Sequence, residues 1–338
     1  MQTPRPTMRA ANFSALAGAR RILLAVSGGP DSMALMLLAA RWARRDAAAP
    51  ELCVATVDHG LRPGSADEAA QVGVWASARG LSHTILRWEG DKPTRAIQEK
   101  ARAARYALLV AHARAIGAQA LATAHHAEDQ AETVLFRLLR GSGVAGLAGM
   151  TALSIRDGLP LHRPLLDWSK AELAAVCAAE GQAFLDDPSN RDPAFARARL
   201  RAGAATLAAG GLDRDALIRL ARRAARAEQA LTRATDAAEA RLRPDGLGLD
   251  ALALIELPDE IALRLVERLA RGASGGEKPA RLDRLESVVG RLRDAARAGR
   301  GLNASLAGAV LSLDKAGKLT ARRESPRRRG RKESVSSR

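Results

Sequence analysis

The sequence predicts a doubly wound α/β domain with a parallel sheet, followed by a smaller, mainly helical domain. From residue 21 onward, short apolar runs alternate with longer segments of helical periodicity, which is typical of repeated strand-helix units. The first run leads through a Gly-Gly turn into a helix-like segment. Beyond about residue 200, Ala-, Leu- and Arg-rich segments carry apolar residues at helical spacing, which indicates a second domain built mainly from helices.

The first domain is expected to alternate four strands with four helices. The strands are predicted at Ile22 to Val26, Leu52 to Val57, Ser82 to Trp88 and Ala118 to Ala124. The helices are predicted at Asp31 to Arg45, Ser65 to Arg79, Arg95 to Ile116 and Ala127 to Arg140. Ligands of such sheets bind outside the carboxyl ends of the strands, so the residues that follow each strand are the candidates for function.

Turn and capping signals predict the elements that follow. Asp157-Gly158 is a hairpin turn signal between strands at Thr151 to Arg156 and Leu159 to Arg163. Ser169 with Glu172 forms a capping box that opens a helix, and Gly181 closes it. The later elements are a loop at Asp186 to Asn190, helices at Asp213 to Leu242, Asp259 to Arg271 and Arg281 to Ala298, and a hairpin of Val310 to Leu313 with Lys318 to Ala321.

Four parts of the chain follow from these elements. Residues 1–20 form an N-terminal extension, residues 21–200 the α/β domain, residues 201–325 the mainly helical domain with its terminal hairpin, and residues 326–338 a basic tail. Between Lys318 and Arg338 nine basic residues stand against two acidic ones, a net charge of +7. We expect the tail to be disordered and its charges to contact RNA, with a solvated extension as the alternative.

Composition narrows the class of protein. The 338 residues carry a formal charge of +16, and Arg outnumbers Lys among the 53 basic residues, which suits binding to a polyanion such as RNA. An Ala- and Arg-rich composition can equally reflect nucleotide bias in a genome. Cys53 and Cys177 lie far apart in apolar surroundings, so neither a disulfide framework nor a metal cluster is expected. Without a membrane-length apolar run or a signal peptide before Arg20, we expect a cytoplasmic protein that contacts no membrane.

The segment Ser27-Gly28-Gly29-Pro30-Asp31-Ser32 has the features of a phosphate-binding loop between a buried strand and a helix. Its two glycines let backbone N–H groups turn inward, and the two serine hydroxyls and the helix N-terminus add donors. Asp31 would repel bare phosphate, so we expect it to bind Mg²⁺ or to cap the helix. A Gly-Gly turn before a helix is also a common structural feature. The Gly-Lys-[Ser/Thr] sequence of the ordinary γ-phosphate hydrolases does not follow.

This loop resembles the pyrophosphate-binding loop of the N-type ATP pyrophosphatases, and further segments in the same order resemble the tRNA(Ile)-lysidine synthase family. They are Val57-Asp58-His59-Gly60-Leu61-Arg62, Ala101 to Tyr106, Thr123-Ala124-His125-His126-Ala127-Glu128-Asp129-Gln130-Ala131-Glu132-Thr133, Arg140-Gly141-Ser142-Gly143 with Gly146-Leu147, Arg163-Pro164-Leu165 and Asp187-Pro188-Ser189-Asn190. The matches span residues 27 to 190. One departure is Arg197-Ala198-Arg199-Leu200-Arg201, where the family usually has Asn at the second position.

The resemblance implies an adenine nucleotide alpha hydrolase-like fold and an enzyme with ATP and Mg²⁺ that joins free L-lysine to the wobble cytidine of a tRNA(Ile) with a CAU anticodon. It implies catalytic roles for Asp31, Asp129, His125 and Arg105, with Asp129 as an acceptor for a substrate ammonium group. The expected nucleotide site consists of Ser27 to Ser32 with Asp58, His59 and His126. The expected lysine and tRNA contacts are Arg102, Glu132, Arg140, Ser142, Asp187, Asn190, Arg197, Arg199 and Arg201.

Each of these assignments has a structural alternative. Asp58 and His59 end a strand and fit a simple turn, Arg102 and Arg105 fit a solvated helix face, and Arg140 to Gly143 fits a helix stop as well as a hinge. His125 and His126 are adjacent and point apart on an extended chain, which argues against zinc. The rival functions are a tRNA-thiolating enzyme, which needs Cys-x-x-Cys pairs, a glutamine-dependent amide synthetase, and a non-catalytic RNA-binding module. The sequence leaves the oligomeric state open, with a homodimer as one alternative.

Overall fold

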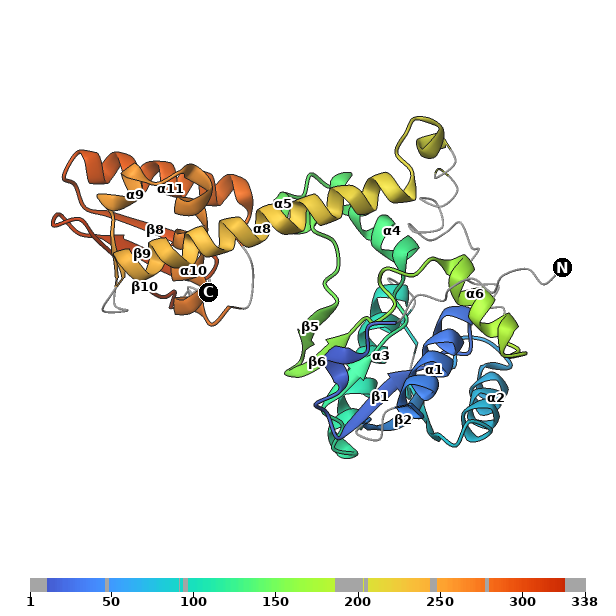
Figure 1. Ribbon diagram of the computed structural model, residues 1–338. Helices are drawn as coiled ribbons and strands as arrows, with labels where there is room; N and C mark the ends of the chain where they lie inside the picture. Colours follow the sequence, from blue (N-terminus) through green and yellow to red (C-terminus); the bar gives the residue numbers. More distant parts are fainter. Residues whose placement is uncertain are drawn as a thin grey trace, which may run out of the picture. The chain divides into compact units, whose positions relative to one another are not determined.

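The computed structural model describes residues 11–45, 49–90, 92–93, 97–185, 203, 206–243, 248–276 and 280–325. The chain forms two compact units, Met1–Ala225 and Arg226–Arg338, and each is described by itself (Figure 1). No helix among these residues is long and apolar enough to cross a membrane. The candidate site lies entirely in the first unit.

A six-stranded sheet forms the centre of the first unit, in the order β3-β2-β1-β4-β6-β5. All neighbouring strands are parallel except the β5–β6 hairpin at the edge. This arrangement confirms the predicted doubly wound sheet and puts its switch point between β1 and β4. The strands are β1 (Arg21–Ala25), β2 (Glu51–Asp58), β3 (Ser82–Arg87), β4 (Ala120–Ala122), β5 (Leu153–Arg156) and β6 (Leu159–His162).

Helices cover both faces of this sheet because alternate strand residues point to opposite sides. Ile22 and Leu24 share a core with α1, α2 and α6, whereas Leu23 packs with α3 in a separate core. The helices end within a few residues of the predicted positions, as is usual for such boundaries. They are α1 (Pro30–Ala43), α2 (Ser65–Ser77), α3 (Ile97–Ala115), α4 (Ala127–Leu138), α5 (Val144–Leu147) and α6 (Lys170–Ala179), and a 3₁₀ helix, η1 (Ser14–Leu16), precedes β1.

Two local predictions beyond the fourth helix are confirmed. Asp157 and Gly158 join β5 to β6 with φ angles of 48° and 79°, the left-handed pair that a type I′ hairpin turn needs. Ser169 caps α6: its Oγ accepts the backbone N–H of Glu172 at 3.2 Å, and the Glu172 carboxylate accepts the backbone N–H of Ser169 at 2.7 Å. The turn closes the hairpin at the edge of the sheet, and the cap starts the helix that follows this hairpin.

The second unit combines helices with a four-stranded antiparallel sheet of order β7-β10-β9-β8. The sequence predicted the three long helices and the β9–β10 pair but missed β7, β8 and the short helix between Ala253 and Glu256. β8 is only five residues long and contains Asn303 and Ala304, which are residue types depleted in strands, and the β8–β9 turn is built on Ala307 and Gly308, with φ angles of 48° and 79°, instead of a usual turn dipeptide. The elements are α8 (Arg214–Leu242), which begins in the first unit, β7 (Leu249–Asp250), α9 (Ala253–Glu256), α10 (Asp259–Ser274), α11 (Leu282–Arg297), β8 (Leu302–Leu306), β9 (Ala309–Leu313) and β10 (Lys318–Arg323).

Candidate functional site

The predicted phosphate loop connects the carboxyl end of β1 to the N-terminus of α1. Gly29 is the N-cap of α1, and Pro30 occupies the first helical position, where a backbone N–H is not needed. The Ser32 hydroxyl organises the loop: its Oγ donates to the carbonyl of Gly29 at 3.0 Å and accepts the N–H of Ser27 at 3.1 Å. The loop is therefore held open by its own side chains around the helix N-terminus, where an anion is stabilised.

Gly28 can be replaced by no other residue without strain. Its φ is +88°, and a Cβ at this position would lie 2.4 Å from Cδ1 of Leu185. The N–H of Leu185 also donates to the carbonyl of Gly28 at 2.9 Å. The segment after α6 thus returns to the phosphate loop and covers one side of it.

His126 brings the phosphate loop together with the first turn of α4. It is the N-cap of α4, and its backbone N–H donates to the Asp129 carboxylate at 3.2 Å. Its Nε2 lies 3.4 Å from Oδ2 of Asp31 and 3.5 Å from Oδ2 of Asp129. The structure therefore brings three predicted site residues together: the carboxylates of Asp31 and Asp129, from the first turns of α1 and α4, meet at the imidazole of His126.

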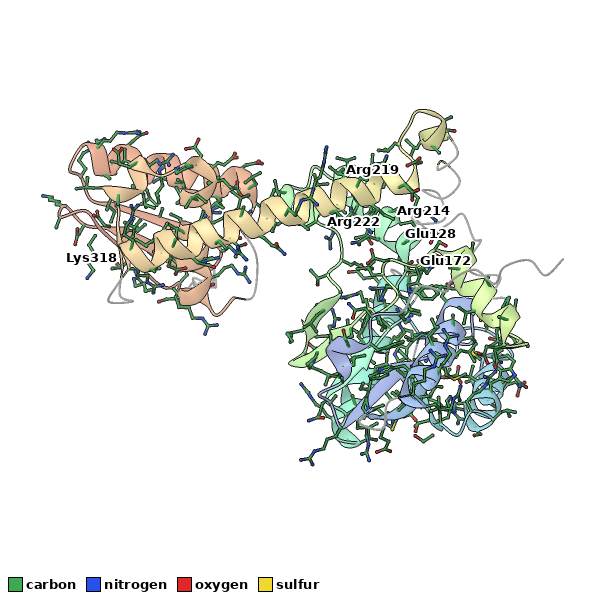
Figure 2. The ribbon with its side chains drawn as sticks, viewed as in Figure 1. Glu128, Glu172, Arg214, Arg219, Arg222 and Lys318 are labelled. Carbon is green, nitrogen blue, oxygen red and sulfur yellow. The ribbon has the colours of Figure 1, made fainter. Side chains whose placement is uncertain are left out.

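Glu128 completes this group and was not among the residues singled out from the sequence. Its Oε2 lies 3.0 Å from Nδ1 of His126 and accepts the backbone N–H of Lys170 at 2.9 Å, while Oε1 accepts from Arg214 at 3.0 Å. Figure 2 shows Glu128 and Arg214 together in the first unit. Its position between His126 and Asp129 in the motif was the available signal, but the partner Arg214 lies 86 residues away in sequence.

These contacts make His126 a cation. Burial lowers its pKa, but hydrogen bonds to Asp31 and Glu128 and the charge of Asp129 outweigh burial and raise the pKa to about 10. Burial likewise opposes ionisation of Glu128, yet the hydrogen bonds from His126 and Arg214 lower its pKa to about 2. The group is thus an imidazolium among three carboxylates.

One carboxylate oxygen of Asp31 takes no part in these contacts. Its Oδ1 is buried and has no hydrogen-bond partner among the described residues. A buried carboxylate oxygen without a partner is an acceptor for a hard cation such as Mg²⁺, which prefers a few carboxylate oxygens and phosphate oxygens as ligands. The described residues contain no cluster of three or more His, Cys, Asp or Glu side chains that could hold a metal ion.

Asp58 and His59 lie at the carboxyl end of β2, as predicted. The Asp58 carboxylate accepts the backbone N–H of Gly60 at 2.9 Å, and although burial raises its pKa, hydrogen bonds from the Ser65 side chain and from Gly60 lower it overall. Burial and the nearby Arg105 guanidinium lower the pKa of His59. The His59 ring stands edge-on to Trp88 with centroids 5.9 Å apart, and its buried Nδ1 has no partner in the described chain. His59 therefore offers a neutral nitrogen and a ring face beside the sheet edge.

Arg102 and Arg105 lie in the first half of α3 and share the ring of Tyr106. Their guanidinium carbons lie 5.2 Å and 5.5 Å from the ring centroid, and Arg156 of β5 lies 4.9 Å from it. Stacking on a buried ring fixes long side chains that would otherwise be mobile. Arg102 is exposed and Arg105 is half-buried, so both cations lie at the surface of α3 beside this ring.

The remaining described site residues lie on or beside α4. His125 Nδ1 is 2.8 Å from the Thr123 hydroxyl, so the two adjacent histidines have different partners, as expected. Glu132 is half-buried one turn after Asp129. Arg140 follows the end of α4 and stacks on Phe136 at 4.0 Å, and Ser142 lies in the turn before α5. The predicted tRNA contacts Asp187, Asn190, Arg197, Arg199 and Arg201 lie outside the described residues.

Comparisons with known proteins identify the family of the chain and several relatives. Residues 3–207 match the model of the PP-loop domain family. The chain is 50% identical over 322 residues to the tRNA(Ile)-lysidine synthase of Bradyrhizobium sp. strain BTAi1, covering 90% of each chain. It is 51% identical over 319 residues to the tRNA(Ile)-lysidine synthase of Methylobacterium nodulans, covering 91% of this chain and 92% of that one.

Among solved structures, the U34-tRNA thiolase NcsA of Methanococcus maripaludis, with its [4Fe-4S] cluster, has a TM-score of 0.52 at 17% identity, covering 63% of this chain and 75% of that one. At that identity the likeness concerns the fold alone. The family match and the relatives extend over more than half of the chain and include the phosphate loop and the His126 group. The chain belongs to the PP-loop family and, within it, to the tRNA(Ile)-lysidine synthases.

Proposed function

We propose that the chain uses ATP to adenylate the C2 carbonyl oxygen of the wobble cytidine in a tRNA(Ile) with a CAU anticodon, and then joins L-lysine to C2. In the first step the carbonyl oxygen bonds to the α-phosphorus and pyrophosphate leaves. In the second step the ε-amine nitrogen bonds to C2, the bond from C2 to oxygen breaks, AMP leaves with that oxygen, and the amine loses a proton. The convergence of Asp31 and Asp129 on His126 is the observation that carries this proposal.

The phosphate side of the reaction belongs to the loop from Ser27 to Ser32. Its glycines, hydroxyls and helix N-terminus suit a pyrophosphate group, as argued above. Asp31 would hold Mg²⁺ through its partnerless Oδ1, and the metal would supply positive charge to the leaving pyrophosphate. Asp58, His59 and His126 surround the space at the ends of β2 and β4, where the adenosine is proposed to lie.

The amine side belongs to the first turns of α4. Asp129 is proposed to accept a hydrogen bond from the ammonium group of lysine, with Glu132 one turn further along the same helix. Holding the amine, the cytidine and the adenylate in one geometry removes most of the entropic part of the barrier, so alignment suffices without a protein nucleophile. Arg105 and Arg102, fixed on Tyr106, are proposed to balance phosphate charge.

The RNA side includes residues at the ends of the described elements. Arg140 and Ser142 follow α4, and Asp187, Asn190 and the arginines 197, 199 and 201 are proposed from the family resemblance as further contacts. Ala198 replaces the usual Asn there, so the contacts of that amide are absent, while Arg197 and Arg199 are still expected to donate charge-assisted hydrogen bonds to phosphates.

One incubation tests the function. Purified protein with ATP, Mg²⁺, labelled lysine and tRNA(Ile) is expected to release pyrophosphate and to incorporate label into the RNA. The same RNA with uridine at the wobble position is the matched control and is expected to take up no label. Pyrophosphate release without incorporation of lysine would instead indicate another adenylating reaction, and no release at all would indicate a non-catalytic RNA-binding protein.

A tRNA-thiolating activity is the rival within the same fold. Thiolation requires cysteines that carry sulfur or hold a cluster. The sequence has two cysteines; both are buried and free, and Cys177 donates to the carbonyl of Pro30 behind the phosphate loop at 3.4 Å. Burial raises the pKa of Cys177 to about 11, which makes it a poor nucleophile. The residues of the site therefore favour ligation of lysine.

A further inference from the structure

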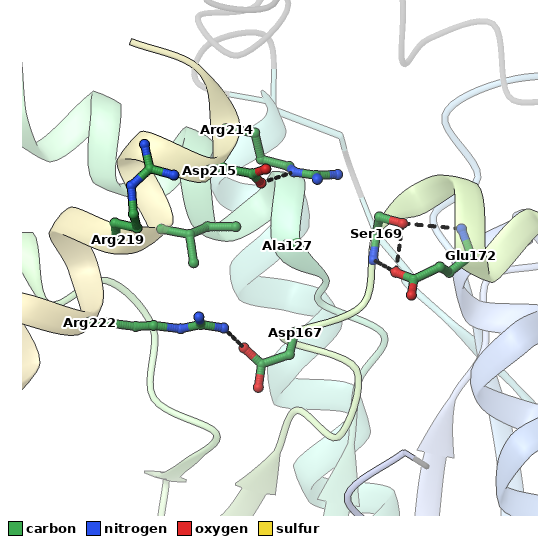
Figure 3. Close-up of a pocket in the computed structure, with 9 residues that line it drawn as sticks. Ala127, Asp167, Ser169, Glu172, Arg214, Asp215, Arg219 and Arg222 are labelled. Atoms are coloured by element: carbon green, nitrogen blue, oxygen red, sulfur yellow. Dashed lines mark hydrogen bonds and ion pairs between the residues drawn. The ribbon is translucent and has the colours of Figure 1, made fainter. Parts of the chain in front are cut away.

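A polar cavity of about 510 Å³ lies next to the candidate site in the first unit (Figure 3). It is bordered by Ala127 at the start of α4, by Ser169 at the start of α6, and by the first two turns of α8. Ala127 stands between His126 and Glu128 in sequence, so the cavity begins where the carboxylate group of the site ends. Three arginines of α8 line it: Arg214, Arg219 and Arg222.

The acidic side chains that line the cavity already have partners. Asp167 pairs with Arg222 at 2.9 Å, and Asp215 pairs with Arg214 at 2.9 Å. Glu172 accepts from the backbone N–H and the hydroxyl of Ser169, both at 2.7 Å. Figure 3 shows these three contacts at the edges of the cavity. The acids therefore anchor the walls, and any further anion has to be bound by the cations that remain.

Arg219, which lines the cavity, and Arg223, which does not line it, lie on one face of α8. Arg219 and Arg223 are exposed, and neither forms an ion pair with a residue that the structure describes. They are four residues apart, with Arg222 beside them, so their side chains lie next to each other on the helix surface. Between residues 214 and 225, four arginines stand against one aspartate, a net charge of +3.

The second half of the same helix is different. Residues 226–242 carry three arginines and three acids, a net charge of zero. Within the second unit, Glu228 of α8 pairs with Arg264 at 2.7 Å and Asp236 pairs with Arg268 at 2.7 Å. The charges of α8 are thus balanced where the helix packs in the second unit, whereas the part of α8 at the cavity has a net positive charge. A helix face that is merely exposed to solvent does not by itself explain this excess of arginines at the cavity.

We propose that the cavity and the arginine face formed by Arg219, Arg222 and Arg223 bind phosphodiester groups of the RNA substrate. Guanidinium groups at neighbouring helix positions suit neighbouring phosphates of one strand, which they bind through paired N–H donors. The polar lining does not suit an apolar ligand. Arg214, which lines the cavity, also donates to Glu128 of the candidate functional site. RNA bound in the cavity therefore lies next to that site. That the polyanion is RNA rests on the proposed function.

Binding of tRNA(Ile) across a salt series, without ATP or lysine, tests this assignment. The test variant is Arg219→Ala/Arg223→Ala, which breaks no ion pair among described residues. The matched control is Arg44→Ala/Arg45→Ala, which removes two exposed arginines at the far end of α1, away from the carboxyl edge of the sheet. Each lost phosphate contact lowers the log–log slope by about 0.7 to 0.9, so the test variant is expected to lose about 1.4 to 1.8.

The same slopes give the expected change in affinity. Two contacts account for a factor of about 25 to 60 in binding at 0.1 M relative to 1 M salt. The control variant is expected to keep the wild-type slope within about 0.3, since its arginines contact no RNA in this proposal. A further change, Arg222→Lys, keeps the positive charge but removes the planar guanidinium group with its paired N–H donors. Weaker tRNA binding after this change supports contacts made through those paired donors.

Two outcomes overturn the proposal. In one, the test variant binds tRNA with the affinity and slope of the wild-type protein, or no differently from the control variant. In the other, inorganic phosphate stabilises the wild-type protein against thermal unfolding, this effect is lost in the test variant, and tRNA binding is unchanged, which makes the cavity a site for free phosphate. Failure of the proposed lysine ligation is visible separately, because it leaves the binding curves as they are.

Discussion

Replacing Glu128 by Gln tests the group around His126 most directly. The carboxylate serves three donors: Nδ1 of His126, the backbone N–H of Lys170, and Arg214, all between 2.9 and 3.0 Å. A Gln side chain keeps one oxygen, but its amide nitrogen then faces a donor whichever way the amide is turned. The negative charge that holds the imidazolium is also lost.

The expected cost follows from burial. The contact with His126 is a charge-assisted hydrogen bond to a side chain that is 8% exposed, which is worth about 1.5 to 3 kcal/mol. The contact with Arg214, whose side chain is 41% exposed, adds less than about 1 kcal/mol because solvent screens it. The two contacts together come to about 1.5 to 4 kcal/mol, and at about 2 to 4 °C per kcal/mol for a domain of this size the melting temperature of the first unit should fall by about 3 to 16 °C.

Calorimetry at pH 7 in the presence of EDTA measures this change. Arg214→Met is the matched variant, since it removes only the exposed contact and should lower the melting temperature by less than about 4 °C. The reasoning is refuted if Glu128→Gln melts within about 1 °C of the wild-type protein. It is also refuted if Arg214→Met is as destabilising as Glu128→Gln, because the cost would then not come from His126.

Three further predictions concern the carboxylates of the site. Asp31→Ala should slow tRNA-dependent pyrophosphate release at least about 100-fold while tRNA binding is retained, and normal release by a folded variant would exclude a metal role. Asp129→Asn should raise KM for lysine about 10- to 150-fold and change KM for ATP far less; equal changes would make Asp129 a ligand of ATP. In metal-free protein, the raised pKa of His126 means that its contribution to stability is complete below about pH 6.5 and lost as pH rises through about 10. A melting temperature that falls as steeply between pH 7 and 10 in His126→Gln as in the wild-type protein contradicts this.

Sequence reasoning was strongest where function and backbone geometry depend on the same local residues. The loop from Ser27 to Ser32, the turn at Asp157 and the capping box at Ser169 are short patterns with one favoured structure each. The loop from Ser27 to Ser32 lies at the carboxyl ends of the parallel strands β1, β2 and β4. This position follows from the predicted doubly wound sheet, because its ligands bind outside those ends.

Contacts between segments that lie far apart in the sequence could not be predicted. Nothing in the sequence indicates that Glu128 meets Arg214, that Leu185 closes against Gly28, or that three arginines share one tyrosine ring. These depend on how helices pack after the chain has folded, and a single sequence contains no signal for the pairing. β8 is different: Leu302, Ala304 and Leu306 alternate with polar residues, as in a half-buried strand, but the run is only five residues long and contains Asn and Ala, which are depleted in strands.

The position of His126 between Asp31 and Asp129 links two ligand equilibria. Three carboxylates share its positive charge, and two of them, Asp31 and Asp129, approach the same nitrogen, Nε2, at 3.4 Å and 3.5 Å. A cation bound to Asp31 offsets part of the negative charge of that carboxylate, so Asp31 attracts the His126 imidazolium less strongly. The imidazolium charge then acts more strongly on Asp129. Under the proposed roles, metal and pyrophosphate at the loop then weaken the hold of Asp129 on an ammonium group. By thermodynamic reciprocity a bound ammonium weakens metal binding by the same factor, so release of pyrophosphate favours retention of the amine that reacts next.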